Sequence, residues 1–256
     1  MDPLGVGLLV AGAAVAGWID AVIGGGGLVL IPLIMAVFPQ LAPAVALATN
    51  KVAAVSGTAT ATVTLLRKVG ADKKKVVSYV PIALVCSGVG AFLASHIDKA
   101  VMRPVVIVLL LVAGTFVALR PQFGQDVAKD RTLTTARKLG AVGLVACVAF
   151  YDGIFGPGTG MFLIMGFSAI LAQDFMTSAV LAKVVNTSTN VGALIVFIAA
   201  GHVLWKLALM LAVANIIGAQ LGARTVIAGG TKLLRAALLT LVVVMSCYLT
   251  FQQFSA

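Results

Sequence analysis

Four ionisable side chains lie inside long apolar stretches of the sequence: Asp20, Lys51, Asp152 and Lys183. On insertion scales a charge at the centre of a bilayer costs about 2.5–3.5 kcal/mol, so these groups need partners or a wet cavity. Two ammonium groups can bind a small oxyanion through charge-assisted hydrogen bonds. The chain contains no glutamate and no His/Cys constellation, so we expect no catalytic residue, no metal site and no cofactor.

The composition indicates that lipid surrounds most of the chain. Hydrophobic residues make up 61% of its 256 residues, and charged residues make up 10%. Soluble proteins carry roughly 25% charged residues, and a soluble fold of this size cannot hide so much apolar surface. The apolar runs are continuous, which predicts an all-α polytopic membrane protein. The net charge of +10 does not indicate nucleic acid binding, because the basic residues fall mostly in short loops.

Glycines interrupt two of the apolar stretches close to the aspartates. The first break is Gly24–Gly27, and the second is Gly156–Gly160, which includes one proline. Such a break exposes backbone N–H groups at the start of the next half-helix, near Leu28 and Gly160, and these groups attract anions. Tight helix packing is the plain alternative, but broken helices in corresponding halves are typical of a transporter's substrate site.

The second half of the sequence repeats the first at an offset of 132 residues, without a gap. Asp20 corresponds to Asp152, and Lys51 corresponds to Lys183. Chance does not readily place two rare intramembrane charge pairs in the same register. We therefore predict a first repeat at 1–119, a cytoplasmic connector at 120–138 and a second repeat at 139–256.

Each repeat contains five apolar segments, and the second of them is too short to span a membrane alone. We predict that it pairs with the preceding segment as a glycine-broken helical hairpin. Each repeat then contains this hairpin and three spanning helices, which gives about 8–10 membrane segments in the whole chain. Gly218 and Gly222 have the spacing of a close helix-packing site. The segments are 4–23, 28–38, 43–66, 76–95 and 101–119, then 139–155, 160–172, 175–200, 204–224 and 233–252.

The distribution of basic residues favours inverted repeats. With three crossings per repeat, thirteen of the eighteen Lys and Arg residues lie on one face and three on the other, while Lys51 and Lys183 lie inside the membrane. Four crossings would make the repeats parallel and reduce the split to eleven against five. The positive-inside rule therefore favours the inverted arrangement and places both termini in the periplasm.

Polar side chains accompany both lysines at helical spacing. Thr58 and Thr62 follow Lys51 on one face, and Asn186, Thr187 and Asn190 follow Lys183. Such stripes predict a polar cavity inside the bundle. A second interpretation is purely structural: each aspartate pairs with the lysine of its own repeat and only holds two helices in register. The aspartates can also pair with the lysines in the empty state, or take up a proton when an anion binds.

The candidate site therefore combines half-helix starts, lysines and small polar groups. Asp20 and Asp152 are the candidate ion-pair or proton-coupling residues. The candidate substrate-binding residues are Gly24, Gly25, Gly26, Gly27, Asn50, Lys51, Gly156, Gly158, Thr159, Lys183, Asn186, Thr187 and Asn190.

Several of these motifs together resemble the sulfite exporter TauE/SafE family, over essentially the whole chain. The residues concerned are Ile19–Leu28, Ala48–Lys51, Tyr151–Gly158 and Lys183–Asn186 with Asn190. The resemblance implies a multi-pass transporter of the bacterial inner membrane that moves sulfite, sulfonates such as sulfoacetate, or related anions. The family is ordinarily described with eight helices, whereas ten apolar segments are counted here; the difference lies in how 28–38 and 160–172 are classed.

Two functions are compatible with the sequence. The first is transport of small anions, coupled to protons through the aspartates, with an anionic substrate and the lipid bilayer as partners. The alternative is a non-transporting membrane scaffold, which would tolerate neutralisation of the charged pairs. The sequence sets no oligomeric state.

Overall fold

The computed structural model describes residues 3–69, 77–97, 100–101, 104–109, 112 and 134–227. Helices form the regular structure in these ranges, and no strand occurs within them, so the all-α prediction is confirmed there. The helices are α1 (Pro3–Ile23), α2 (Gly27–Val37), α3 (Pro43–Val69), α5 (Val80–His96), α7 (Thr135–Ile154), α8 (Thr159–Leu171), α9 (Phe175–Ala199) and α10 (Trp205–Ile227).

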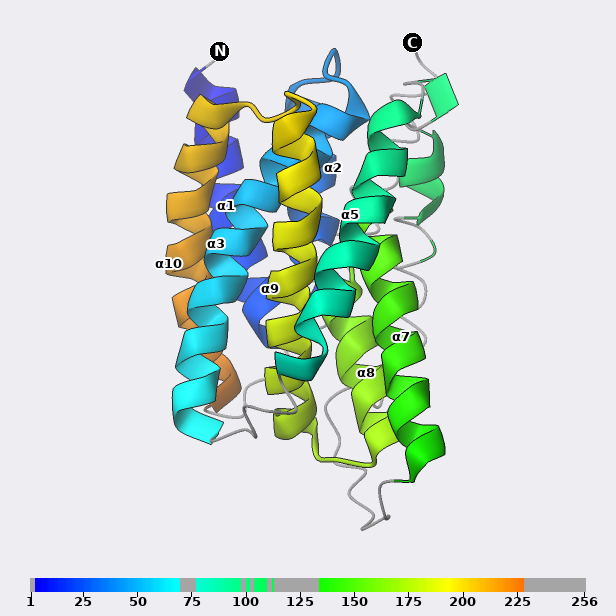
Figure 1. Ribbon diagram of the computed structural model, residues 1–256. Coiled ribbons are helices and arrows are strands. Elements are labelled where there is room, and N and C mark those ends of the chain that lie inside the picture. Colours follow the sequence, from blue (N-terminus) through cyan, green and yellow to red (C-terminus); the bar gives the residue numbers. More distant parts are fainter. Residues whose placement is uncertain are drawn as a thin grey trace.

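Helices at equivalent positions of the two halves run in opposite directions through the bundle. In Figure 1, α1 and α3 run from the upper end to the lower end, whereas their counterparts α7 and α9 run upward. In the same way α5 runs upward and its counterpart α10 runs downward. The lower end therefore collects the end of α3, the start of α7 and the end of α10.

The two short apolar segments are helices that fold back from their glycine breaks, as predicted. α2 has 11 residues and α8 has 13, which is too short to cross a hydrocarbon core that needs about 20 residues. α2 packs against α1, and α8 packs against α7. Each pair is therefore a hairpin whose turn lies inside the bundle (Figure 1).

Three helices of the described part of the chain are long and apolar enough to cross a membrane: α1, α9 and α10. α3 has 27 residues and is interrupted by Lys51, with Arg67 and Lys68 in its last turn. α7 has 20 residues and contains Asp152 near its end. These charges lower the mean hydropathy of α3 and α7, although α3 is longer than the three apolar helices and α7 is only one residue shorter than α1.

Close packing between the halves depends on glycine. α10 crosses α1 with Gly218 and Gly222 against its backbone, and a Cβ on Gly222 would overlap the carbonyl oxygen of Trp18. The equivalent crossing of α5 and α7 places Gly90 against the carbonyl oxygen of Phe150 in the same way. The predicted packing role of the two glycines of α10 is confirmed. Each half thus supplies a helix to the other, because α10 packs on α1 and α5 packs on α7.

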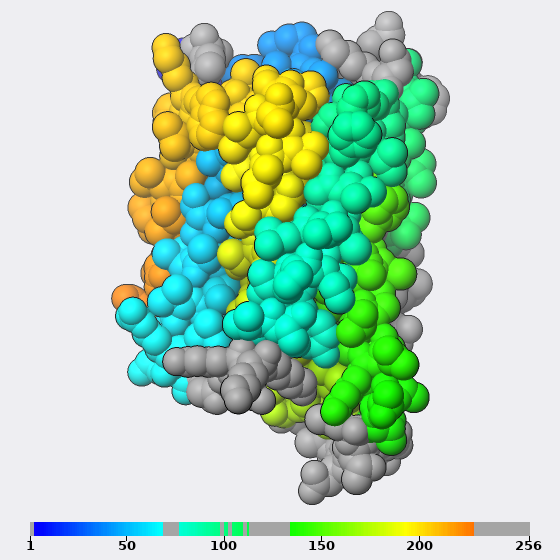
Figure 2. All heavy atoms as spheres, viewed as in Figure 1, coloured from blue at the N-terminus to red at the C-terminus, as the bar shows by residue number. Residues whose placement is uncertain are grey.

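The outer surface of the bundle is apolar, as expected for contact with lipid. Figure 2 shows α3, α9 and α5 side by side on the near face, with α9 in the middle. Exposed apolar side chains of α5 and α9, among them Val85 and Ile195, cover this face. A shallow apolar groove of about 460 Å³ follows the seam between α5 and α9 at Gly88 and Gly192. The charged residues of the interior are hidden behind these helices.

Three predicted segments differ from the structure or lie wholly or partly outside the described residues. α7 begins at Thr135, four residues before the predicted segment at 139, because the side chain of Thr134 caps the helix by accepting from the Arg137 N–H. The predicted segment 233–252, residues 102–103, 110–111 and 113–119 of the predicted segment 101–119, and residues 120–133 of the predicted connector lie outside the described residues. The domain boundaries at 119 and 138 therefore stay predictions.

Asp174 caps the start of α9. Its carboxylate accepts hydrogen bonds from the Thr177 N–H at 2.8 Å and from the Thr177 hydroxyl at 2.6 Å. Burial alone raises the pKa of this carboxyl, but the hydrogen bonds outweigh burial, so the pKa lies below its usual value of 3.8. The ionised carboxylate therefore stabilises the folded protein above that pH.

Replacing the cap tests this contribution. Asp174→Ala should lower the free energy of unfolding by about 1 kcal/mol, as at other helix N-caps. Asp174→Asn should preserve most of it, because asparagine caps equally well. The loss caused by Asp174→Ala should shrink as the pH falls from 3.8 through the lower pKa of Asp174 in the folded protein, because the carboxylate becomes protonated over that range. Thermal unfolding in detergent measures all three; an equal loss in the alanine and asparagine variants would contradict the capping role.

A pair of glycine substitutions tests the packing of α1 on α10. Gly218→Ala places a Cβ against the backbone of Ala14 and should destabilise the fold by about 1–3 kcal/mol, the usual range for overpacking. Gly7→Ala on α1 is the matched control, because a Cβ there meets no atom within 4 Å. We expect Gly218→Ala to lower the unfolding temperature and Gly7→Ala to leave it unchanged. Equal behaviour of the two variants would show that the crossing is loose.

Candidate functional site

The two glycine breaks meet in the centre of the bundle. Gly24 has a φ of +78°, and a Cβ on it would overlap the backbone of Gly160. A Cβ on Gly27 would stand 3.3 Å from the Cα of Pro157. Only glycine combines a left-handed backbone with so close an approach. The breaks therefore form one site rather than two.

Each break starts a half-helix whose first turn faces the aspartate that precedes it. α2 begins at Gly27 and α8 at Thr159, each one residue before the predicted starts at Leu28 and Gly160. The Gly26 N–H donates to Asp20 Oδ1 at 3.3 Å, and the Thr159 hydroxyl donates to Asp152 Oδ1 at 2.7 Å. Both carboxylates thus lie where a helix start attracts an anion.

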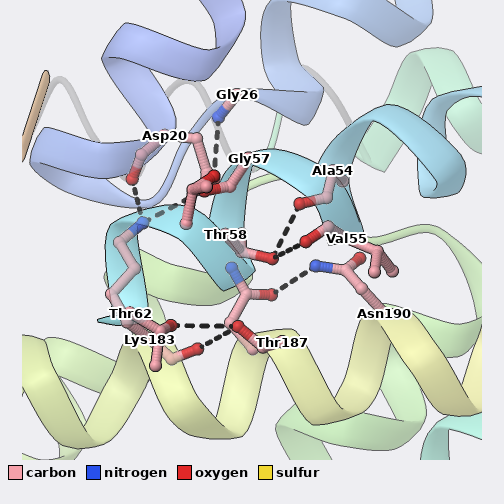
Figure 3. Close-up of polar contacts among 12 residues, drawn as sticks. Asp20, Gly26, Ala54, Val55, Gly57, Thr58, Thr62, Lys183, Thr187 and Asn190 are labelled. Atoms are coloured by element: carbon pink, nitrogen blue, oxygen red, sulfur yellow. Dashed lines mark hydrogen bonds and ion pairs between the residues drawn. The ribbon is translucent and has the colours of Figure 1, made fainter. Parts of the chain in front are cut away.

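The intramembrane charges form two ion pairs that cross between the halves. Lys51 Nζ lies 2.7 Å from Asp152 Oδ2, and Lys183 Nζ lies 3.0 Å from Asp20 Oδ2. Lys183 also donates to the backbone carbonyl of Asp20, as Figure 3 shows. The predicted pairing of each aspartate with the lysine of its own half is therefore wrong. The breaks overlap at the centre, so the carboxylate nearest to each ammonium group belongs to the other half.

Amide and hydroxyl groups complete the surroundings of the lysines. Lys51 Nζ donates to Asn190 Oδ1 at 2.9 Å, and Asn190 Nδ2 donates to Asn186 Oδ1 at 3.3 Å. The hydroxyls of Thr62 and Thr187 lie 3.1 Å apart and join α3 to α9 (Figure 3). The polar stripes predicted on these two helices therefore face each other along the seam between α3 and α9.

A small polar cavity lies among these groups. Its volume is about 20 Å³, which is room for a single water molecule. Its walls combine both aspartates, one lysine, three asparagines, three glycines of the breaks and one alanine. The lining residues are Asp20, Gly24, Gly27, Asn50, Lys51, Ala54, Asp152, Gly156, Asn186 and Asn190.

Several predicted site residues lie close to this cavity without lining it. Lys183 lies behind Asp20, and Thr187 is occupied by Thr62 and by the carbonyl oxygen of Lys183. Gly158 has a φ of +84° and lies against the ring of Phe162. The remaining predicted residues, Gly25, Gly26 and Thr159, belong to the breaks that frame the cavity.

Two residues of the site were not predicted. Ala54 lines the cavity at the position equivalent to Asn186, so the 132-residue offset could have identified it. Tyr151 donates its hydroxyl to the Pro157 carbonyl oxygen at 2.7 Å and braces the second break. Tyr151 opens the Tyr151–Gly158 motif of the sequence, but its contact with the break was not predicted. In the described ranges no three His, Cys, Asp or Glu residues are grouped as metal ligands.

Comparison with known proteins identifies related membrane proteins. The chain matches the family model "Sulfite exporter TauE/SafE" over residues 9–249. It is 34% identical over 251 residues to "Probable membrane transporter protein YfcA" of Escherichia coli (strain K12), covering 98% of this chain and 91% of that protein. It is 33% identical over 230 residues to "Probable membrane transporter protein ORF9" of Sinorhizobium sp, covering 89% and 85%. No solved structure matches the chain significantly.

A double-mutant cycle tests how strongly the buried ion pair between Lys51 and Asp152 is coupled. Removing one partner of a buried pair costs about 3–5 kcal/mol, whereas replacing both with uncharged groups is often neutral. Lys51→Met and Asp152→Asn should therefore each lower the unfolding temperature, and the double variant should recover most of the loss. Lys51→Met combined with Asp20→Asn is the control, since these residues are not paired. Equal recovery in both double variants would contradict the crossed pairing.

Proposed function

Because the chain belongs to the sulfite exporter TauE/SafE family, we propose that this membrane transporter moves a small organosulfur oxyanion through its central site. The family description names sulfite, and sulfonates and related anions are further candidates because they present the same kind of oxygen atoms. The observation that carries the proposal is the pair of buried ammonium groups at two touching half-helix starts. Each ammonium group now holds a carboxylate, and an oxyanion offers the same acceptor oxygens to the same donors.

The conformation described here is closed to such a substrate. A cavity of about 20 Å³ holds a water molecule but no sulfo group. Binding therefore requires at least one carboxylate to leave its lysine and the half-helices to separate. Transport then consists of opening the site to one side of the membrane at a time, which broken helices in opposed halves permit.

The arrangement of the halves supports inverted repeats and a defined orientation. Equivalent helices run in opposite directions (Figure 1), as inversion requires. Among the described residues, Arg67, Lys68, Arg137, Lys138 and Arg224 belong to helix ends at the lower side, whereas Lys206 begins α10 at the upper side. Under the positive-inside rule the lower side is cytoplasmic. In the bacterial inner membrane this orientation places the start of α1 on the periplasmic side.

Proton coupling follows from the charge balance of the site. Two ammonium groups and two carboxylates give a net charge of zero in the closed state. Adding a monoanion leaves an uncompensated negative charge in the membrane, which is costly. Protonation of one carboxylate restores neutrality, so anion and proton move together. This balance predicts that a lower pH on the side of entry favours uptake of the anion.

Transport in liposomes tests the proposal. Purified protein should move labelled sulfite or sulfoacetate, and Lys51→Ala or Lys183→Ala should reduce this at least about tenfold, a loss of about 1.4 kcal/mol. Lys206→Ala, at the start of α10, is the matched control and should transport normally. Thermal shift in detergent supplies a second measurement, because a bound anion stabilises the fold by mass action.

Two results would overturn the proposal. Unimpaired transport in both lysine variants would place the substrate elsewhere. Absence of transport and of anion-dependent stabilisation in the parent protein would favour the scaffold alternative. The double variant Lys51→Met with Asp152→Asn should stay folded, because it leaves no unpaired buried charge. Loss of transport in this variant would therefore not be a result of unfolding.

A further inference from the structure

The two ion pairs are built differently, although the sequence repeat makes them equivalent. Both carboxylate oxygens of Asp152 accept bonds of 2.7 Å, from Lys51 and from the Thr159 hydroxyl, and the side chains of the pair are each 2% exposed. The side chain of Asp20 is 15% exposed. Apart from Lys183, it accepts a longer bond of 3.3 Å from the Gly26 N–H. The Asp20 carboxylate therefore accepts as many bonds as that of Asp152, but both of its bonds are longer and its side chain is more exposed.

The glycine breaks beside the two aspartates differ in the same direction. The second break contains Pro157, whose ring fixes φ, and the Tyr151 hydroxyl holds its carbonyl oxygen at 2.7 Å. Thr159 also donates to the Gly156 carbonyl oxygen at 2.7 Å. The equivalent positions in the first break are Ile19, Gly25 and Gly27, which offer no such bonds. Consecutive glycines allow a wider range of backbone angles, so the first break can change shape more readily.

Asp20 lies between the polar cavity and the ammonium group of Lys183. Asp20 lines the cavity and binds Lys183, whereas Lys183 itself is not part of the cavity wall. The Asp20 carboxylate therefore separates the cavity from the ammonium group. If this side chain turned away, the cavity would gain Lys183 and the Gly26 N–H as donors. Lys51 already lines the same cavity from α3.

We propose that Asp20 is the carboxylate that gives up its lysine for a proton when the anion binds, while the Lys51–Asp152 pair stays closed as a brace. This inference rests on the proposed function and names the coupling residue within it. A proton from water on the side of entry forms an O–H bond on Asp20, and Lys183 remains an ammonium group. The site then holds two positive charges and one negative charge, which one monoanion neutralises. When the anion leaves, Asp20 releases the proton and binds Lys183 again.

Among the described residues, few charged groups lie around Asp20. Lys183 faces it from α9, and Lys51 and Asp152 share its cavity from α3 and α7. Of the other helices packed against α1, α2 and α8 contain no titratable side chain. α10 contains Lys206 in its first turn and Arg224 in its last turn, at opposite ends of the helix. Protonation of Asp20 is favoured when an anion already binds Lys183, so anion affinity should rise as the pH falls.

Calorimetric titration in buffers of different ionisation enthalpy tests the inference. The probe is methanesulfonate, which stays a monoanion throughout the working pH range, and sulfite is the second probe. We expect the parent protein to take up about one proton per anion bound. Asp20→Asn should bind the anion with about no proton uptake and with an affinity independent of pH. Asp174→Asn is the control acid outside the site and should behave like the parent.

A variant next to Asp152 tests which of the two carboxylates takes up the proton. Thr159→Val weakens the bonding of Asp152 without removing a charge, and proton uptake per bound anion should persist in it. Persistent proton uptake in Asp20→Asn, or loss of proton uptake in Thr159→Val, would overturn the inference about Asp20. Neither result would contradict the proposed anion transport. Failure of the parent protein to bind either probe would instead refute the proposed function.

Discussion

The structure depends on two ion pairs that cross between the halves of the chain inside an apolar bundle. Lys51 binds Asp152 and Lys183 binds Asp20, with little or no exposure to solvent. Charges in such surroundings are costly unless each has a partner with good geometry, and removal of one partner typically costs several kcal/mol. The pairs therefore link α1 to α9 and α3 to α7, so neither half can satisfy its own charges alone.

The glycine breaks make this pairing possible. Gly24 and Gly160 bring the two hairpin turns into backbone contact, at a distance that any Cβ would prevent. The same breaks direct two half-helix starts toward the carboxylates. Close glycine crossings between α1 and α10, and between α5 and α7, hold the remaining helices around the site. Backbone freedom and charge pairing are thus two parts of one arrangement.

Repetition in sequence does not make the two halves of the site identical. The second break contains Pro157 and Thr159 where the first has Gly25 and Gly27, and Tyr151 braces only the second. The cavity lies on the side of Lys51 and leaves Lys183 behind Asp20. In a transporter this asymmetry separates a fixed part of the site from a part that can move, because tightly bonded groups rearrange less readily than glycine-rich ones.

The sequence by itself determined the helical class and the broken hairpins. Continuous apolar runs require helices in lipid, and intramembrane charges require partners, which Lys51 finds in Asp152 and Asn190. Only the tertiary structure decided which lysine binds which aspartate and which groups line the cavity. Pairing depends on where two turns 132 residues apart come into contact, and equal spacing in the two halves leaves that choice open.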